Sequence, residues 1–270
     1  MSNKGREGGL LAQAPTALLG FLIILVAVLL AVAGATLVHN RVPVALRESH
    51  TVPLGLINGG LNVMFGVIVG FTSFLVLGEY SDAQQAVQSE AGDLEEIYRL
   101  AQPLPEAKQD QIQGLAASYA RVVVDEEWPL MRQARTSPRA DALVEELRRS
   151  IQEGYRTSTG TQQEIYGKAL DVMDELDEDR EARLIAVRQR LPSILWIALV
   201  VLAIAIIGFS FLVGMDNRRL HLLTVGALAT GITLVLFTIG TLDRPFGTDF
   251  QVRPQPFELL LHEIEGNRSR

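Results

Sequence analysis

The chain has 270 residues, of which 48% are hydrophobic and 20% are charged, which is too apolar for an ordinary soluble domain and too charged for a chain lying wholly in lipid. A formal net charge of -7 excludes the basic surface that neutralises phosphates, so we expect no nucleic-acid partner. The absence of cysteine excludes disulfides, thiolate zinc sites and cysteine nucleophiles, and the four histidines are scattered, so we expect no metal and no cofactor.

Four apolar segments are each long enough to cross a bilayer as a helix. Such a helix needs about 20 mostly apolar residues to cross a hydrocarbon layer roughly 30 Å thick. None of the four segments contains a charged residue; they are residues 17–38, 54–77, 192–213 and 222–241. The first follows Lys4 and Arg6, but its apolar run is longer than a secretory core, so we predict a membrane anchor.

The spacing of these segments predicts an all-α integral membrane protein with two helical hairpins. Its parts are an N-terminal tail (1–16), a first transmembrane hairpin (17–77), a hydrophilic helical insertion (78–191), a second transmembrane hairpin (192–241) and a C-terminal tail (242–270). With four spans, both tails and the insertion share one side of the membrane. Lys and Arg are more frequent next to the membrane on that side, which favours the cytoplasm for all three.

Residues 78–191 have helical periodicity throughout and no strand-like alternation. Apolar residues recur at three- and four-residue steps, as a helix with one buried face requires. We expect Pro129 to break or kink one helix, Ser137 to cap the next, residues 154–160 to form a turn, and Thr161 with Glu164 to form a capping box. The expected inward positions are Ala83, Val87, Ala91, Leu94, Tyr98, Ala101, Ile112, Leu115, Tyr119, Val122, Val123, Leu143, Val144, Leu147, Ile151, Ile165, Ala169, Val172, Leu176, Leu184 and Val187.

The densest run of charge, DELDEDREARL at residues 174–184, has two interpretations. A calcium-binding loop would need a glycine at its turn and a closing glutamate, and this run has neither. We therefore interpret it as a solvated helix face, with Asp179 and Arg183 forming an i, i+4 pair.

The second span carries a stripe of small and polar residues beside bulky apolar ones. The stripe contains Gly55, Asn58, Gly59, Asn62, Gly66, Val69, Gly70 and Ser73, and Val67, Phe71 and Phe74 lie next to it. One hypothesis is close helix packing, because glycines let backbones approach and Gly66–Gly70 is a G-x-x-x-G pair. The other is a pore wall in an oligomer, where the asparagines contact water or ions and the phenylalanines form an apolar constriction.

The segment LDRPFGTDFQVRP, residues 242–254, follows the last span directly. Pro245 and Gly247 predict a turn just outside the bilayer, Phe246 could lie in the membrane interface, and Arg244 could reach lipid headgroups. Asp243 and Asp249 could instead fold around a hydrogen-bond donor or a cation. Both the structural turn and the ligand site remain open at this point.

Four segments of the chain resemble a bacterial bestrophin-like family and, more distantly, the bestrophins. They are LGEYSDAQQAV (77–87), VVVDEEWP (122–129), LPSILW (191–196) and LDRPFG (242–247). The resemblance implies a homo-oligomer, a pentamer if truly bestrophin-like, in a bacterial inner membrane. Bestrophins are anion channels, with some bacterial relatives preferring cations, so the resemblance also implies that the second span lines an ion pore with Val67, Phe71 and Phe74 or Leu75 at its apolar neck. Together with the stripe, this gives Asn58, Asn62, Gly66, Val67, Gly70, Phe71 and Phe74 as the expected pore-lining residues of an anion channel. The calcium site of animal bestrophins is not implied, because only Asp249 stands where several acids would be needed.

No phosphate-binding glycine loop, HExxH or G-x-S-x-G motif is present, so we expect no enzyme. The leading hypothesis is a passive ion channel in the bilayer. The alternative is a membrane scaffold or sensor whose helical insertion binds partner proteins.

Overall fold

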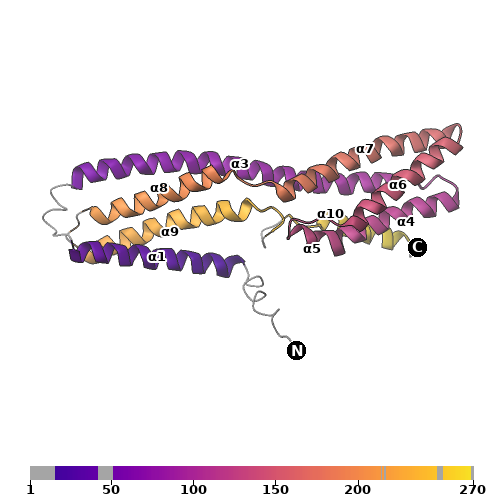
Figure 1. The fold of residues 1–270 in the computed structure, drawn as a ribbon. Coiled ribbons are helices and arrows are strands. Elements are labelled where there is room, and N and C mark those ends of the chain that lie inside the picture. The colour runs from indigo at the N-terminus through magenta and orange to yellow at the C-terminus, as the bar shows by residue number, and fades with distance from the viewer. Residues whose placement is uncertain (1–15, 42–50, 214, 216, 248–251, 269–270) are drawn as a thin grey trace, which may run out of the picture. The chain divides into compact units, whose positions relative to one another are not determined.

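A computed structural model describes residues 16–41, 51–213, 215, 217–247 and 252–268. Throughout these residues the chain is helical or in turns, and no strand occurs among them, which confirms the all-α class (Figure 1). The chain divides into two compact units, one made of residues 1–77 and 190–243 and the other of residues 78–189 and 244–270.

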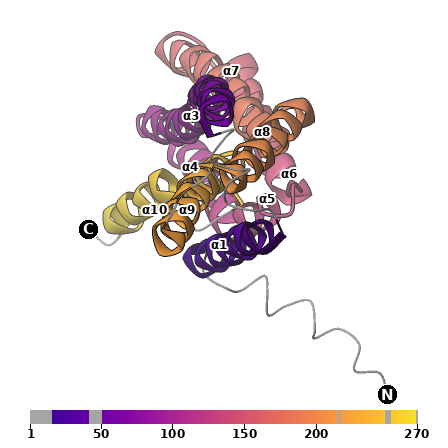
Figure 2. The same cartoon turned by 90° about the vertical axis from the view of Figure 1, so that its left-hand side faces the viewer.

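The first unit holds four helices that are long and apolar enough to cross a membrane, as predicted. They are α1 (Thr16–Arg41), the first part of α3 (Thr51–Leu100), α8 (Ser193–Leu212) and α9 (Arg218–Leu242). Helix α1 packs mainly on α9 and less extensively on α8, and Figure 2 shows α1 beside α9.

Two glycines let α1 approach its neighbours closely. A Cβ atom built on Gly20 would lie 2.6 Å from the ring of Phe237 on α9, and one built on Gly34 would lie 2.7 Å from the ring of Phe211 on α8. These distances are too short for a real side chain, so both rings lie directly against the α1 backbone. This is the small-residue packing that membrane helices use where lipid supplies no hydrophobic driving force.

One face of α3 packs against α8 and α9. Phe65, Val76 and Thr72 are buried on this face, and the first two share a cluster with Leu199 and Ile206 of α8. The opposite face of α3 is exposed over the whole apolar part of the helix.

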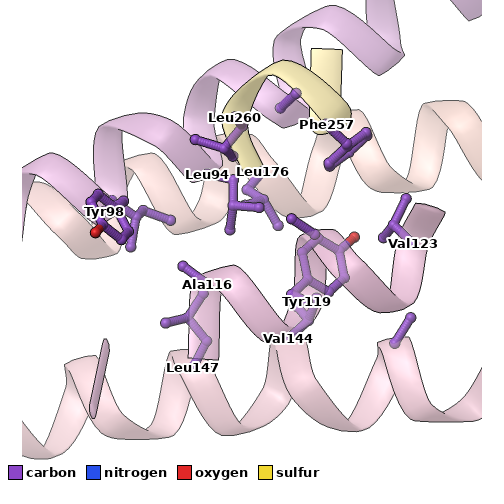
Figure 3. Close-up of a cluster of buried hydrophobic side chains, with 14 of the residues drawn as sticks. Leu94, Tyr98, Ala116, Tyr119, Val123, Val144, Leu147, Leu176, Phe257 and Leu260 are labelled. Carbon is purple, nitrogen blue, oxygen red and sulfur yellow. The ribbon is translucent and has the colours of Figure 1, made fainter. Parts of the chain in front are cut away.

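The second unit is a helical bundle with one hydrophobic core. Residues 78–100 of α3 pack there with α4 (Glu106–Val122), a π-helical turn η1 (Val123–Glu127), α5 (Trp128–Met131), α6 (Pro138–Thr157), α7 (Thr161–Arg188) and α10 (Gln255–Arg268). Figure 3 shows Leu94, Tyr119, Leu147, Leu176 and Phe257 converging from five of these segments. The inward positions predicted from periodicity are buried, except Leu115, Leu143, Ile165 and Leu184, which are partly buried.

Pro129 widens its helix rather than stopping it. Proline offers no N–H and its ring clashes with the carbonyl four residues earlier. The turn before it is π-helical, with the Trp128 N–H donating to the Val123 carbonyl, and the helix continues to Met131. Such widened turns often occur at functional positions.

The predicted helix ends are partly right. Ser137 caps α6 as expected, its hydroxyl oxygen accepting from the Ala140 N–H at 3.4 Å. The capping box at Thr161 is wrong, because Gly160 occupies the cap position with φ 63° and Thr161 is already helical. The turn at 154–160 is also shorter than predicted, since α6 runs on to Thr157.

Candidate functional site

The exposed face of α3 carries most of the predicted pore residues. Val67, Phe71 and Phe74 are 66%, 58% and 75% exposed, which is unusual for large apolar side chains unless lipid or another chain covers them. Gly66 and Gly70 are exposed beside them, and a Cβ atom built on either would meet nothing within 4 Å. In a single chain, therefore, these glycines do not serve helix packing.

Asn58 and Asn62 lie apart from that face, toward the packed side of the helix. Both are partly buried, and the Asn62 side-chain amide donates to the Asn58 carbonyl at 2.7 Å. The Asn58 Oδ1 atom is buried, and no hydrogen-bond partner for it occurs among the described residues. The predicted pore residues thus separate into two groups. Glycines and large apolar side chains lie on the exposed face of α3, and the two asparagines lie between that face and the packed side.

Asp243 ends α9 and binds the start of α8. Its Oδ1 accepts from the Leu191 N–H at 2.7 Å, and its Oδ2 accepts from the Trp196 indole at 3.4 Å. The Arg190 guanidinium reaches the Asp243 carbonyl at 3.5 Å. The buried Asp243 carboxylate therefore accepts from an N–H just before a helix, and the group it folds around is a hydrogen-bond donor.

The residues after Asp243 form the predicted turn. The Gly247 N–H donates to the Arg244 carbonyl at 3.0 Å, with Pro245 in the second position that such turns favour. Arg244 is exposed, and Asp249 lies outside the described residues. Placing Phe246 in a lipid interface was wrong: it is 3% exposed and contacts Trp128 edge to face, with ring centroids 5.6 Å apart.

The second unit contains a fully buried ionic network that the sequence analysis missed. Arg183 binds the Glu90 carboxylate with two nitrogens, its Nη2 also donates to Glu127 at 2.8 Å, and its guanidinium carbon lies 5.8 Å from the Trp128 ring centre. Arg183, Glu90 and Glu127 are each 0% exposed. Such a cluster is tolerable in a core only if charges and hydrogen bonds are matched.

Arg180 and Tyr119 supply the remaining positive charge and hydrogen bonds of this cluster. Arg180 donates to both oxygens of Glu127 at 2.9 and 3.0 Å, and to the Tyr119 hydroxyl at 2.7 Å, while that hydroxyl donates to Glu90. Burial would raise the pKa of Glu127, but the charge of Arg183 and the hydrogen bonds from Arg180 hold that pKa below its ordinary value. Burial and then the charge of Glu90 raise the pKa of Tyr119 well above its ordinary value. We call these five residues the buried network; within it two arginines face two glutamates, and Arg180 also binds the exposed Asp141 carboxylate at 2.6 Å at the edge of the network.

This network corrects the interpretation of residues 174–184 as a solvated face. Arg183 does not pair with Asp179, and Arg180 and Arg183 point into the core. A signal was present in the sequence, because both arginines continue the apolar register of Val172, Leu176 and Val187. Glu90 likewise occupies the inward register of α3.

Comparison with known families decides what kind of protein this is. The sequence matches the bestrophin-like domain over residues 25–257. The chain belongs to the bestrophin-like family. Among curated proteins, no match is found.

The fold of this bestrophin-like protein is similar to solved structures. Crystal structures of two variants of a bacterial bestrophin homologue from Klebsiella pneumoniae match with TM-scores of 0.67 and 0.64, at 16% and 14% identity. These matches cover 90% and 92% of this chain, and 97% and 99% of the homologue. A crystal structure of a membrane protein variant matches with a TM-score of 0.66 and 15% identity, over 90% of this chain and 96% of that one.

Three of the four segments that resemble the family have clear structural roles. LPSILW and LDRPFG meet where Leu191 and Trp196 bind Asp243. VVVDEEWP supplies Glu127 to the buried network and Trp128 to the ring contact with Phe246. Within the described part of the chain, no group of three or more His, Asp or Glu residues is arranged to hold a metal ion.

Proposed function

We propose that this bestrophin-like protein assembles as a homo-oligomer in a bacterial inner membrane and passes ions passively across it. The exposed face of α3, with Gly66, Val67, Gly70, Phe71 and Phe74, surrounds the common axis. By the family resemblance the ring is a pentamer and the ions are anions. Both termini and the helical insertion 78–191 lie in the cytoplasm.

The observation that carries the proposal is the open glycine face of α3. Elsewhere in the first unit, Gly20 and Gly34 are covered by phenylalanine rings of the same chain, whereas Gly208 on α8 and Gly231 on α9 are open but isolated in sequence. Gly55, Gly59, Gly66 and Gly70 have nothing within 4 Å of an added Cβ atom. Lipid contact alone does not favour glycine, whereas the close approach of helices from several chains does.

The chemistry of this face suits a gate without fixed charge. No acidic or basic residue occurs in α3 before Glu79. A ring of Phe74 and Val67 side chains would make a narrow apolar constriction, which resists ions when it loses water. Asn58 and Asn62 lie toward the packed side of α3, and their amides would hydrogen-bond water in the part of the conduit beyond this constriction.

Anion flux from liposomes tests the proposal. We expect purified protein to release chloride from loaded liposomes above the rate of protein-free liposomes. Phe74→Ala should raise that rate several-fold, because the apolar constriction widens. Phe21→Ala is the matched control, since Phe21 is 62% exposed on α1 and the proposal gives it only lipid to contact.

Two results would contradict the channel. One is flux equal to that of empty liposomes in both the unmodified protein and Phe74→Ala. The other is an equal rise in Phe21→Ala, which would indicate nonspecific leakage. A sealed monomer or dimer would favour the alternative, a scaffold whose helical insertion binds partner proteins.

A further inference from the structure

A hollow between α3 and α10 lies within the second unit, apart from the buried network. Its volume is about 490 Å³, which falls within the usual range for small-molecule sites, about 300–1,000 Å³. The two helices that form it are fixed to each other elsewhere. Leu94 of α3 and Leu260 of α10 share the hydrophobic core (Figure 3), and Arg99 of α3 pairs with Glu263 of α10 at 3.7 Å.

The hollow combines an apolar floor with polar side chains at its rim. Val87 and Val252 line it and are 1% and 4% exposed, so they form the floor. Gln84, Gln88 and Gln255 line it and are exposed, and their amide groups can donate hydrogen bonds. Apolar surface with a few convergent polar groups is typical of a site for a small molecule.

The charge of the hollow favours an anion. Among the described residues that line it, Arg253 is the only charged one. Arg253 is exposed and forms no hydrogen bond or ion pair with the described part of the chain; Glu258 lines an adjoining hollow without pairing with it. Helix α10 begins at Gln255, so the positive end of its dipole lies here as well. In a chain with net charge -7, an unpaired guanidinium in a hollow without acids attracts a negative ligand.

We propose that this hollow binds a small monocarboxylate that has an apolar body. The Arg253 guanidinium can donate two parallel N–H bonds to one carboxylate, and the glutamine amides can donate to its remaining lone pairs. The apolar body then lies against Val87 and Val252. A single unpaired arginine matches a single negative charge, whereas a phosphate dianion would need a second cation. Such a ligand contacts both helices, so its binding stabilises the second unit whether or not the protein conducts ions.

Equilibrium dialysis of radiolabelled benzoate against the full-length protein in detergent tests this inference. Benzoate carries its carboxylate on an apolar ring, and benzamide has a similar shape without the charge. We expect saturable binding of one benzoate per chain above the level of protein-free detergent, with a dissociation constant of about 1 mM. Excess benzamide should displace little of it, and inorganic phosphate should displace less than the same concentration of unlabelled benzoate.

Two substitutions of exposed side chains locate the bound benzoate. Arg253→Gln removes the positive charge and should weaken binding about tenfold or more. Gln88→Glu introduces an acid of nearly the same shape and should weaken binding by repelling the carboxylate. Arg135→Gln, at an exposed site outside the hollow, is the matched control and should bind benzoate as the unmodified protein does. All three variants should keep the unfolding midpoint of the unmodified protein without ligand, because exposed side chains contribute little to stability.

Four results would overturn the inference. The first is the absence of saturable benzoate binding by the unmodified protein. The second is displacement by benzamide as effective as displacement by benzoate, which would show that the charge is not recognised. The third is tighter binding of phosphate than of benzoate. The fourth is benzoate affinity that survives both Arg253→Gln and Gln88→Glu, which would place the bound molecule elsewhere.

Discussion

Replacing Arg183 with methionine tests whether the buried network is a matched set of charges. Glu90 and Glu127 are both 0% exposed, and Arg183 binds both, so the variant leaves one arginine against two glutamates. Breaking a buried ion pair on one side costs about 3–5 kcal/mol. At about 2–4 °C per kcal/mol, the unfolding midpoint should fall by about 6–20 °C.

The double variant Arg183→Met with Glu90→Gln separates charge from packing. It restores one positive against one negative charge, and the amide oxygen introduced by Glu90→Gln still accepts from the Tyr119 hydroxyl. We expect it to recover most of the lost stability, leaving a deficit of about 1–2 kcal/mol from fewer hydrogen bonds. Arg188→Met, exposed on the same helix, should change the midpoint little. Thermal unfolding in detergent, followed by circular dichroism, measures the midpoints of all three variants. A midpoint of Arg183→Met within 1–2 °C of that of the unmodified protein, roughly the effect of one surface change, would refute the reasoning.

Two further predictions concern packing and the helix-start contact. Gly154→Ala should lower the unfolding midpoint, because the new Cβ atom would lie 2.2 Å from the buried Tyr166 ring. Such overpacking costs about 1–3 kcal/mol. Gly114→Ala is the control: its new Cβ atom meets open space, so the variant should raise the midpoint slightly. A stable Gly154→Ala protein would contradict the close contact. Asp243→Ala should destabilise by about 1–3 kcal/mol and shift Trp196 fluorescence in a Trp128→Phe background, since the buried Leu191 N–H and the half-buried Trp196 indole lose their acceptor; an unchanged spectrum would count against that contact.

Much of the fold was predictable because it depends on local patterns. Runs of apolar residues without charge specify membrane helices, and the spacing of Leu94, Leu147 and Leu176 specifies which helix faces turn inward. Helix α3 runs unbroken from Thr51 to Leu100, across the change from apolar to charged composition at Gly78.

The buried network could not be assembled from the sequence. Arg183 and Glu90 are 93 residues apart, and their pairing follows from how α3 and α7 pack rather than from any local spacing. Their inward register was visible, but charged residues are rarely buried without partners, and the partners were not identifiable. Phe246 was misplaced for the same reason, since its neighbour Trp128 lies in a distant segment.

The division of α3 into two faces was only partly foreseen. Glycines and asparagines at helical spacing indicated one stripe along the span. The structure places Phe65, Thr72 and Val76 on the packed side and Asn58 and Asn62 near it, so the exposed face is more apolar than the stripe suggested. A conduit along it would therefore be gated by hydration rather than by amide hydrogen bonds.

Cysteine accessibility along α3 tests the proposed conduit most directly. The chain has no native cysteine, so single substitutions from Val63 to Val76 can be labelled with a charged, water-soluble thiol reagent in proteoliposomes. A conduit predicts labelling at Val63, Val67, Gly70 and Phe74, with loss of anion flux, and protection at Phe65, Thr72 and Val76. A face that contacts only lipid would leave all of these thiols unreactive, and that result would contradict the account.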